Sequence, residues 1–136
     1  MAKVHGKAFG VTVNAVDVKA AASKAGLKLK VDTAEVTNAG SGGNKEYIEG
    51  NADGNLDVSG AADFGAGLQD ASMFALIGAG ATSWKLKPNN AAANSATNPE
   101  FQQDAILTDY SLDFDVSKEI SFSASAQRTG ATTRAV

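Results

Sequence analysis

Four polar residues spaced two apart form the clearest pattern in the sequence that could bind a metal ion. They are Asn51, Asp53, Asn55 and Asp57. Oxygen ligands at such spacing are found in EF-hand calcium loops, which also need glycine at the sixth position and glutamate at the twelfth. Counted from Asn51, those positions hold Leu56 and Ala62; counted from Asp53, they hold Val58 and Phe64. The pattern therefore predicts polar residues along one face of a strand, and no metal site.

A glycine-rich segment, residues 38–44, precedes Lys45 and raises the question of a phosphate-binding loop. A P-loop needs Gly-Lys-Ser/Thr at the start of a helix, because the backbone N–H groups and the lysine act together on the phosphates. Here Lys45 is followed by Glu46 and Tyr47. We therefore expect a flexible loop and no bound nucleotide or other cofactor.

Residues that could support catalysis are few. There is a single histidine, His5, and there is no cysteine to serve as a nucleophile or a thiolate ligand. Serine does not occur in a nucleophile-elbow motif. The carboxylates of Asp113 and Asp115 alternate with apolar residues, so they are expected on a solvated face, and none of the carboxylates lies in the apolar setting that acid catalysis would need. The sequence gives no basis for an enzyme, and no catalytic residue is predicted.

The length suggests a single domain over residues 1–136. The tail 128–136, which carries Gly130 and Arg134, is a candidate for an extended C-terminal arm. The net charge of −3 is too balanced for a dedicated nucleic-acid binder, which usually carries a basic patch. No apolar run reaches the roughly 18 residues of a membrane helix. The N-terminus lacks the apolar stretch of a signal peptide, so we expect synthesis and assembly in a cytoplasm, without membrane association.

The apolar residues are unusually small. Of the 59 apolar residues, 26 are alanine and 28 are valine, leucine, isoleucine or phenylalanine. A large buried side chain contributes about 1.5–3 kcal/mol of transfer free energy, and alanine contributes much less. A light core of this kind favours a protein that gains further burial by self-association.

Residues 110–126 are the segment around which the rest of the chain is organised. Apolar and polar residues alternate strictly on both sides of Ser117–Glu119, which predicts two half-buried strands joined as a hairpin. The apolar face is formed by Tyr110, Leu112, Phe114, Val116, Ile120, Phe122, Ala124 and Ala126. We expect this face to close a core and the serine and aspartate face to meet water.

The remaining chain contains further strands and one helix. Strands are predicted at Lys3–Asn14, Leu27–Val31 and Thr82–Lys87, and Leu27–Val31 has a basic outer face. Tyr47–Val58 is predicted as one bent strand or a pair of strands, and Phe101–Thr108 leads into the final hairpin. A helix is predicted at Gly65–Gly78, with Asp63 as its cap. Val16–Ala25 fits either a helical turn or a connection. The prediction is a mainly β protein: an antiparallel β-sandwich or barrel with one flanking α-helix and two long loops.

The order of several motifs resembles the major tail tube proteins of long-tailed (siphovirus-type) bacteriophages. The motifs are Val31-Asp32-Thr33-Ala34-Glu35-Val36-Thr37, Glu46-Tyr47-Ile48-Glu49-Gly50, Asn55-Leu56-Asp57-Val58-Ser59-Gly60, the helix, Ser83-Trp84-Lys85-Leu86-Lys87-Pro88 and the closing segment Ile120–Gly130. The resemblance covers about Leu27 to Gly130. It implies a β-sandwich with a flanking helix, similar in fold to the type VI secretion tube protein.

The resemblance further implies a structural virion protein. Its copies would form hexameric rings that stack into a tail tube, with other tail proteins at the tube ends, in a particle assembled in the host cytoplasm. DNA would pass through without specific binding, because an acidic channel repels phosphates. The channel-lining candidates are Asp109, Asp113, Asp115, Asp53 and Asp57, with the tube exterior as their alternative location. The candidates for contacts between rings are Asn38, Gly40, Gly42, Gly43, Lys45, Asn89, Asn90, Asn94 and Asn98.

Two other functions stay open at this point. A capsid decoration protein would also be β-rich, and it would form trimers that dock on capsids. A carbohydrate-binding module would need exposed aromatic residues, and apart from phenylalanine the chain has only Trp84, Tyr47 and Tyr110.

Overall fold

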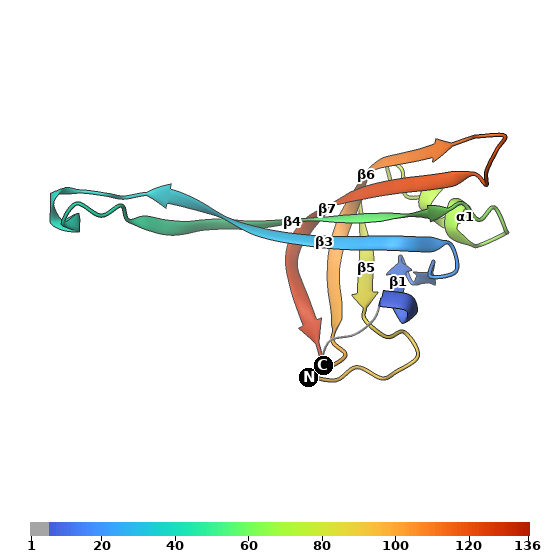
Figure 1. Cartoon of the computed structure of the whole chain (residues 1–136), viewed down its shortest axis with the longest axis horizontal. Coiled ribbons are helices and arrows are strands. Elements are labelled where there is room, and N and C mark those ends of the chain that lie inside the picture. Colours follow the sequence, from blue (N-terminus) through green and yellow to red (C-terminus); the bar gives the residue numbers. More distant parts are fainter. Residues whose placement is uncertain (1–5) are drawn as a thin grey trace.

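The expected antiparallel β architecture is confirmed by the computed structural model, which describes residues 6–136 (Figure 1). His5 lies outside the described residues. The elements in chain order are the 3-10 turn η1 (Gly6–Ala8), β1 (Gly10–Val13), β2 (Val16–Asp17), β3 (Ala22–Glu35), the 3-10 turn η2 (Ala39–Ser41), β4 (Tyr47–Ala61), α1 (Gln69–Phe74), β5 (Ala81–Lys87), β6 (Glu100–Asp113) and β7 (Ser121–Ala135).

A single seven-stranded sheet with the order β2-β1-β5-β6-β7-β4-β3 bends back on itself to make two layers. Layer A contains β3, β4, the first half of β7 and the second half of β6 (107–113). Layer B contains β2, β1, β5, the first half of β6 (100–106) and the second half of β7 (128–135). Figure 1 shows β6 and β7 turning from one layer into the other.

Register shifts mark the places where these two long strands bend. The β6–β7 pairing is interrupted between Gln102 and Asp104 and again between Leu107 and Asp109. Opposite the first shift lies Gly130, whose φ of 79° is a left-handed conformation that glycine adopts without steric cost. The segment 128–135, expected as an extended arm, is thereby held against β6 as part of the sheet.

The core between the layers is built from a few large side chains and several small ones. Trp84, Leu56 and Met73 are its largest fully buried hydrophobic residues. Among the described residues, fourteen hydrophobic residues are buried, and four of these are alanine: Ala21, Ala105, Ala124 and Ala126. Small residues on β6 and β7 allow the two layers to approach closely, in line with the light core expected from composition.

The helix is shorter than the predicted Gly65–Gly78. Gly67 has a positive φ of 71° and Leu68 is extended, so helical geometry begins only at Gln69. Asp63 is not the cap: its carboxylate accepts from the N–H of Gly65 in the preceding turn. The predicted apolar side is retained in part, because Met73 and Leu76 are buried, whereas Phe74 and Ile77 are exposed.

The hairpin of residues 110–126 has the predicted alternation but a longer connection. Tyr110, Leu112, Phe122, Ala124 and Ala126 face the core, whereas Phe114 and Val116 are 69% and 109% exposed, so their predicted burial is wrong. Strand pairing ends at Asp113 because Asp115 forms a turn, in which its carboxylate accepts from both the backbone N–H and the hydroxyl of Ser117. Apolar alternation alone does not show where such a turn begins.

The N-terminal strands also differ from prediction. Val16–Ala25, expected as a helical turn or a connection, contains β2 and the start of β3. Asn14 and Ala15, both with positive φ (49° and 65°), make the tight β1–β2 turn. The predicted Leu27–Val31 strand is the middle of the much longer β3.

A partly buried polar network joins α1 to the hairpin. The hydroxyl of Tyr110 donates to the Asp70 carboxylate at 2.7 Å and accepts from the Gln69 side-chain amide at 3.0 Å. Burial, followed by the hydrogen bond to Asp70, raises the pKa of Tyr110 from 10.0 to about 12. Because the folded state holds the neutral phenol, this contribution to stability is complete below pH 10 and is lost as pH rises through about 12.

The Tyr110→Phe substitution is therefore expected to remove one late phase from a phenolate absorbance titration. It is also expected to lower the free energy of unfolding by about 1 kcal/mol near neutral pH, through the lost hydrogen bonds. Urea unfolding monitored at several pH values measures the second effect. An unchanged titration curve would show that Tyr110 does not titrate late.

Candidate functional site

Most of the aspartates predicted from the sequence to line a channel lie on the outer face of layer A. Strand register places Asp53 and Asp57 of β4 and Asp109 and Asp113 of β6 on this face, opposite the buried residues of the same strands. We call it the charged face. Asp115 is not part of the charged face, because it lies in the β6–β7 connection. There, the hydrogen bonds from Ser117 hold the pKa of the Asp115 carboxyl below its ordinary value.

Hydroxyl and amide side chains of β7 separate the two pairs of aspartates. Ser125 donates to the Asp57 carboxylate at 2.9 Å, and the Gln127 amide donates to Asp53. Ser123 and Ser121 continue this column beside Ser111 and Asp113 of β6. The four strands thus present a polar surface without aromatic side chains.

A row of lysines on β3 completes the charged face, and sequence reasoning did not connect it with the aspartates. Lys24, Lys28 and Lys30 alternate with residues that face the core, and Lys30 is the register partner of Asp53. The basic face of the Leu27–Val31 segment was visible in the sequence, but its position beside the acidic residues depends on β3–β4 pairing. Three lysines and four aspartates leave the face with a net charge of about −1.

The lysines and the two aspartates of β6 lie at opposite sides of layer A. The lysines occupy β3, which forms one edge of the sheet, and Asp109 and Asp113 occupy β6 on the other side. Within the described residues, the only ion pair joins Lys118 to Asp113 at 3.5 Å, and both side chains are largely exposed. The lysines of β3 and Asp109 therefore have no charged partner within 4 Å in the described part of the protomer.

Both sides of layer A also have unpaired backbone edges. Over residues 6–136, β3 pairs with β4 alone, so its other edge is free along its length. β6 pairs with β5 only through Phe101–Ile106, which leaves Leu107–Asp113 with a neighbouring strand, β7, on one side. Free strand edges are sites where another chain can add a strand.

The β3–β4 hairpin extends far beyond the two layers, as Figure 1 shows. We call residues 32–51 the arm. All of them are exposed except Ser41, including the apolar side chains of Val36, Tyr47 and Ile48. An exposed hairpin gains little stability from contacts with its own chain, and its apolar side chains are left in water. The arm is therefore a candidate contact surface for another molecule.

The tip of the arm holds the first set of predicted contact residues in a defined structure. Asn38 caps η2 by accepting from the Gly40 N–H at 2.8 Å, and its own N–H donates to the Ser41 hydroxyl at 3.1 Å. Gly42 and Gly43 follow with positive φ values of 64° and 85°. The predicted flexible loop is thus a compact turn, and Lys45 lies exposed beside it. Its function in contacts between rings stays a prediction.

The second set of predicted contact residues lies in the loop 88–99, which folds onto its own protomer. The buried Asn98 donates to the carbonyls of Asn89, Ala92 and Ala93 and accepts from the Asn89 N–H. Asn90 donates through its backbone to the carbonyl of Ala8. Asn94 remains exposed at the surface of the loop, where a neighbouring molecule could reach it.

We expect Asn98→Ala to loosen this loop and to lower the free energy of unfolding by about 1–3 kcal/mol, because buried backbone carbonyls lose their donor. The matched control is Asn94→Ala, which removes an exposed amide from the same loop. Limited proteolysis and urea unfolding measure the difference. Equal behaviour of the two variants would contradict the structural importance of Asn98.

Across 6–136, no three histidine, cysteine or acidic side chains are grouped so that they could hold a metal ion. In the same range, no helix is both long and apolar enough to cross a membrane.

Comparison with known proteins identifies the fold. No protein-family model and no curated protein sequence matches the chain. Among solved structures, it is similar to a chain of the native gene transfer agent virion, with a TM-score of 0.79, 13% identity and coverage of 98% of this chain and 100% of the other. A chain of the empty gene transfer agent tail, solved with C6 symmetry, gives a TM-score of 0.70 at 13% identity, covering 85% and 83% of the two chains.

The tail tube of SPP1 is similar as well, with a TM-score of 0.72 at 12% identity, covering 98% of this chain and 81% of the SPP1 chain. At such low identities, the likeness shows a shared fold. The chain thus has the fold of tail tube proteins, as the sequence motifs had indicated.

Proposed function

We propose that this protein is the subunit of a phage-type tail tube, a non-enzymatic virion component whose copies join into hexameric rings that stack. The observation that carries the proposal is the pair of free strand edges with opposite charge on the two sides of layer A. The similarity to the tail of a particle solved with C6 symmetry supports a ring of six.

The strand order of layer A suits such a ring. In the order β3, β4, β7, β6, every neighbouring pair is antiparallel. Rotation about a ring axis preserves strand direction, so β3 of one copy meets β6 of the next in antiparallel orientation. The same contact then repeats head to tail until the ring closes.

Charge reinforces this pairing. The junction brings the row of Lys28 and Lys30 on one copy beside Asp109 and Asp113 on the next. Electrostatic complementarity of this kind mainly fixes register and excludes wrong partners. It also explains why Lys28, Lys30 and Asp109 have no charged partner within 4 Å in the described part of the protomer.

In this ring, the charged face lines the central channel. The channel surface then consists of serine, glutamine and paired lysine and aspartate residues, with a small net negative charge. DNA phosphates meet neither a continuous basic track nor stacked aromatic residues, so DNA passes through without specific binding. Asp53 and Asp57 stay inside the channel, while Asp109 and Asp113 also belong to the junction. Other tail proteins would bind the tube ends in a virion assembled in the host cytoplasm.

Negative-stain electron microscopy of the concentrated, purified protein tests this proposal. We expect rings and stacked tubes with a central channel and sixfold top views. Single copies at all concentrations would count against a tube subunit. Trimers that bind capsids would instead favour a decoration protein.

A further inference from the structure

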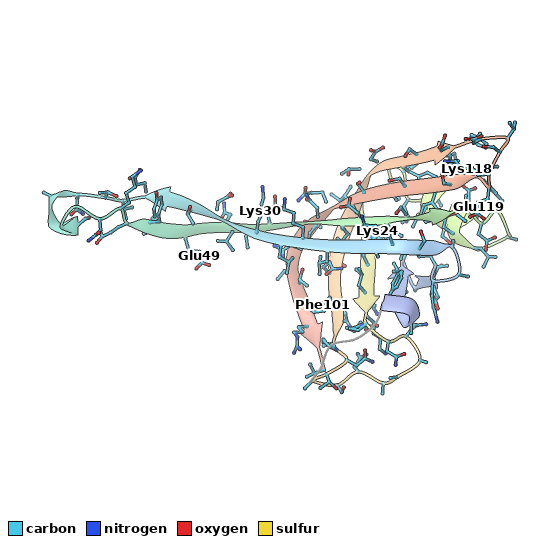
Figure 2. All side chains as sticks on the ribbon, in the orientation of Figure 1. Lys24, Lys30, Glu49, Phe101, Lys118 and Glu119 are labelled. Atoms are coloured by element: carbon cyan, nitrogen blue, oxygen red, sulfur yellow. The ribbon has the colours of Figure 1, made fainter. Side chains whose placement is uncertain are left out.

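An open apolar groove lies where layer A and layer B diverge, on the side of β3. Its volume is about 870 Å³. The described residues that line it include Lys24, Leu27, Leu29, Leu86, Lys87 and Phe101. In Figure 2, Phe101 lies below β3 near the start of β6, and Lys24 lies on β3 above it.

The groove adjoins the core of the sandwich and is open to solvent. Leu27 and Leu86 pack against the core cluster from one side, whereas Leu29, one step further along β3, is 51% exposed. The apolar inner face of β3 therefore continues past the end of layer B without a covering layer. Two lysines and no acidic residue occur among the described lining residues. These features fit an apolar segment that carries negative charge.

The arm has this composition. Its exposed apolar side chains include Tyr47 and Ile48, which are 56% and 55% exposed. Its charged residues are Asp32, Glu35, Glu46 and Glu49 against the single Lys45, which gives a net charge of −3. Figure 2 shows Glu49 on the arm, well away from Lys24 and Phe101 of the same copy.

The geometry excludes docking of the arm into the groove of its own copy. The arm continues the direction of β3 and β4 away from the layers, and the described residues of 32–51 pair only with one another (Figure 1). We therefore propose that the groove of one copy receives the arm of a second copy. This inference rests on the proposed assembly into a tube and names the receiving site for the arm.

In the docked state, apolar side chains at the start of β4, Tyr47 among them, enter between Leu29 and Phe101 of the other copy. Glu46 and Glu49 then lie near Lys24 and Lys87 at the rim. Burial of the apolar side chains supplies most of the affinity, and the rim charges set orientation. The contact completes the light core from outside.

Disulfide trapping tests the contact directly, because the natural chain has no cysteine. We expect the double variant that carries Tyr47→Cys and Lys87→Cys, once assembled, to form intermolecular disulfides under mild oxidation. They would be visible as ladders on non-reducing gels. The control pairs Tyr47→Cys with Val116→Cys, an exposed position in the β6–β7 connection far from the groove. The inference would be overturned if the control pair cross-linked and the pair of Tyr47→Cys with Lys87→Cys did not.

A charge exchange gives the second measurement. The rim variant Lys24→Glu, Lys87→Glu and the arm variant Glu46→Lys, Glu49→Lys should each lower tube yield about tenfold. Their combination in one chain should restore the yield to within about twofold of the natural protein. Lys85→Glu, a lysine of β5 outside the groove, is the control for loss of positive charge.

The outcomes separate the two proposals. If the natural protein forms tubes but neither trapping nor charge exchange succeeds, the groove is not the receiving site and the tube function stands. If the natural protein forms no tubes, the proposed function fails before the groove is tested. Circular dichroism of each variant excludes misfolding as the cause of a lost yield.

Discussion

Replacing Asp32–Asn51 with a two-residue Asn-Gly turn is expected to give a folded protomer that forms no tubes. Val31 and Ala52 are register partners, so a type I′ turn can join them without changing the rest of the sheet. The removed residues are exposed apart from Ser41, so the core should be little affected. Electron microscopy measures tube formation, and urea unfolding checks that stability changes by less than about 1 kcal/mol.

A milder pair of variants controls for this deletion. Tyr47→Ser with Ile48→Ser removes two exposed apolar side chains from the arm, and Phe74→Ser removes one from the end of α1. The arm variant should reduce tube yield strongly, and the α1 variant should leave it nearly unchanged. Normal tubes from the deletion would eliminate the arm as an assembly element.

Reversing the lysine row, with Lys28→Glu and Lys30→Glu together, is expected to block ring closure. At the proposed junction, four carboxylates would then face one another, and like charges in contact cost several kcal/mol. The subunit concentration needed for assembly should rise at least about a hundredfold, since each 1.4 kcal/mol is a factor of ten. Sedimentation across a concentration series measures this shift.

Two further variants make the result specific. Lys28→Gln with Lys30→Gln removes the positive charge without reversing it and should weaken assembly less. Adding Asp109→Lys and Asp113→Lys to the reversed chain should restore rings, because the junction regains opposite charges. The reversed chain also places a glutamate beside Asp53, which should cost the isolated protomer no more than about 1 kcal/mol. Rings from the reversed chain at natural concentrations would contradict the junction.

Much of the inside–outside pattern could be predicted from the sequence, because side chains alternate between faces along a strand. The inward positions of Tyr110, Leu112 and Phe122, and the outward positions of the intervening serines, follow from this period of two. The residues at which strands end were harder to predict from the sequence. Side-chain hydrogen bonds, such as those of Asp115 to Ser117, decide them, and hydrophobic pattern carries no information about these bonds.

Long-range arrangement could not be predicted in the same way. The basic row of β3 and the aspartates of β4 and β6 were each visible, but pairing across three strand boundaries brings them onto one face. The length of the arm could not be predicted either. Thr33–Glu35 and Tyr47–Glu49 pair with each other but pack against no core, so no core imposes an alternation of apolar and polar residues on their sequences. The bends of β6 and β7 depend on register shifts that leave little trace in the sequence.

In the proposed tube, each copy contributes the four strands of its layer A to the wall of the channel, and this even number lets every junction between copies be antiparallel. An antiparallel junction forms equally well between five, six or seven copies, so the chemistry of the edges does not count them. The count must come from the angle through which the backbone of one layer curves, and the bulges at Val31/Thr33 and Leu107/Asp109 contribute to that angle. The bore of the tube is then a property of backbone curvature, free to change while the contacts between neighbours stay the same.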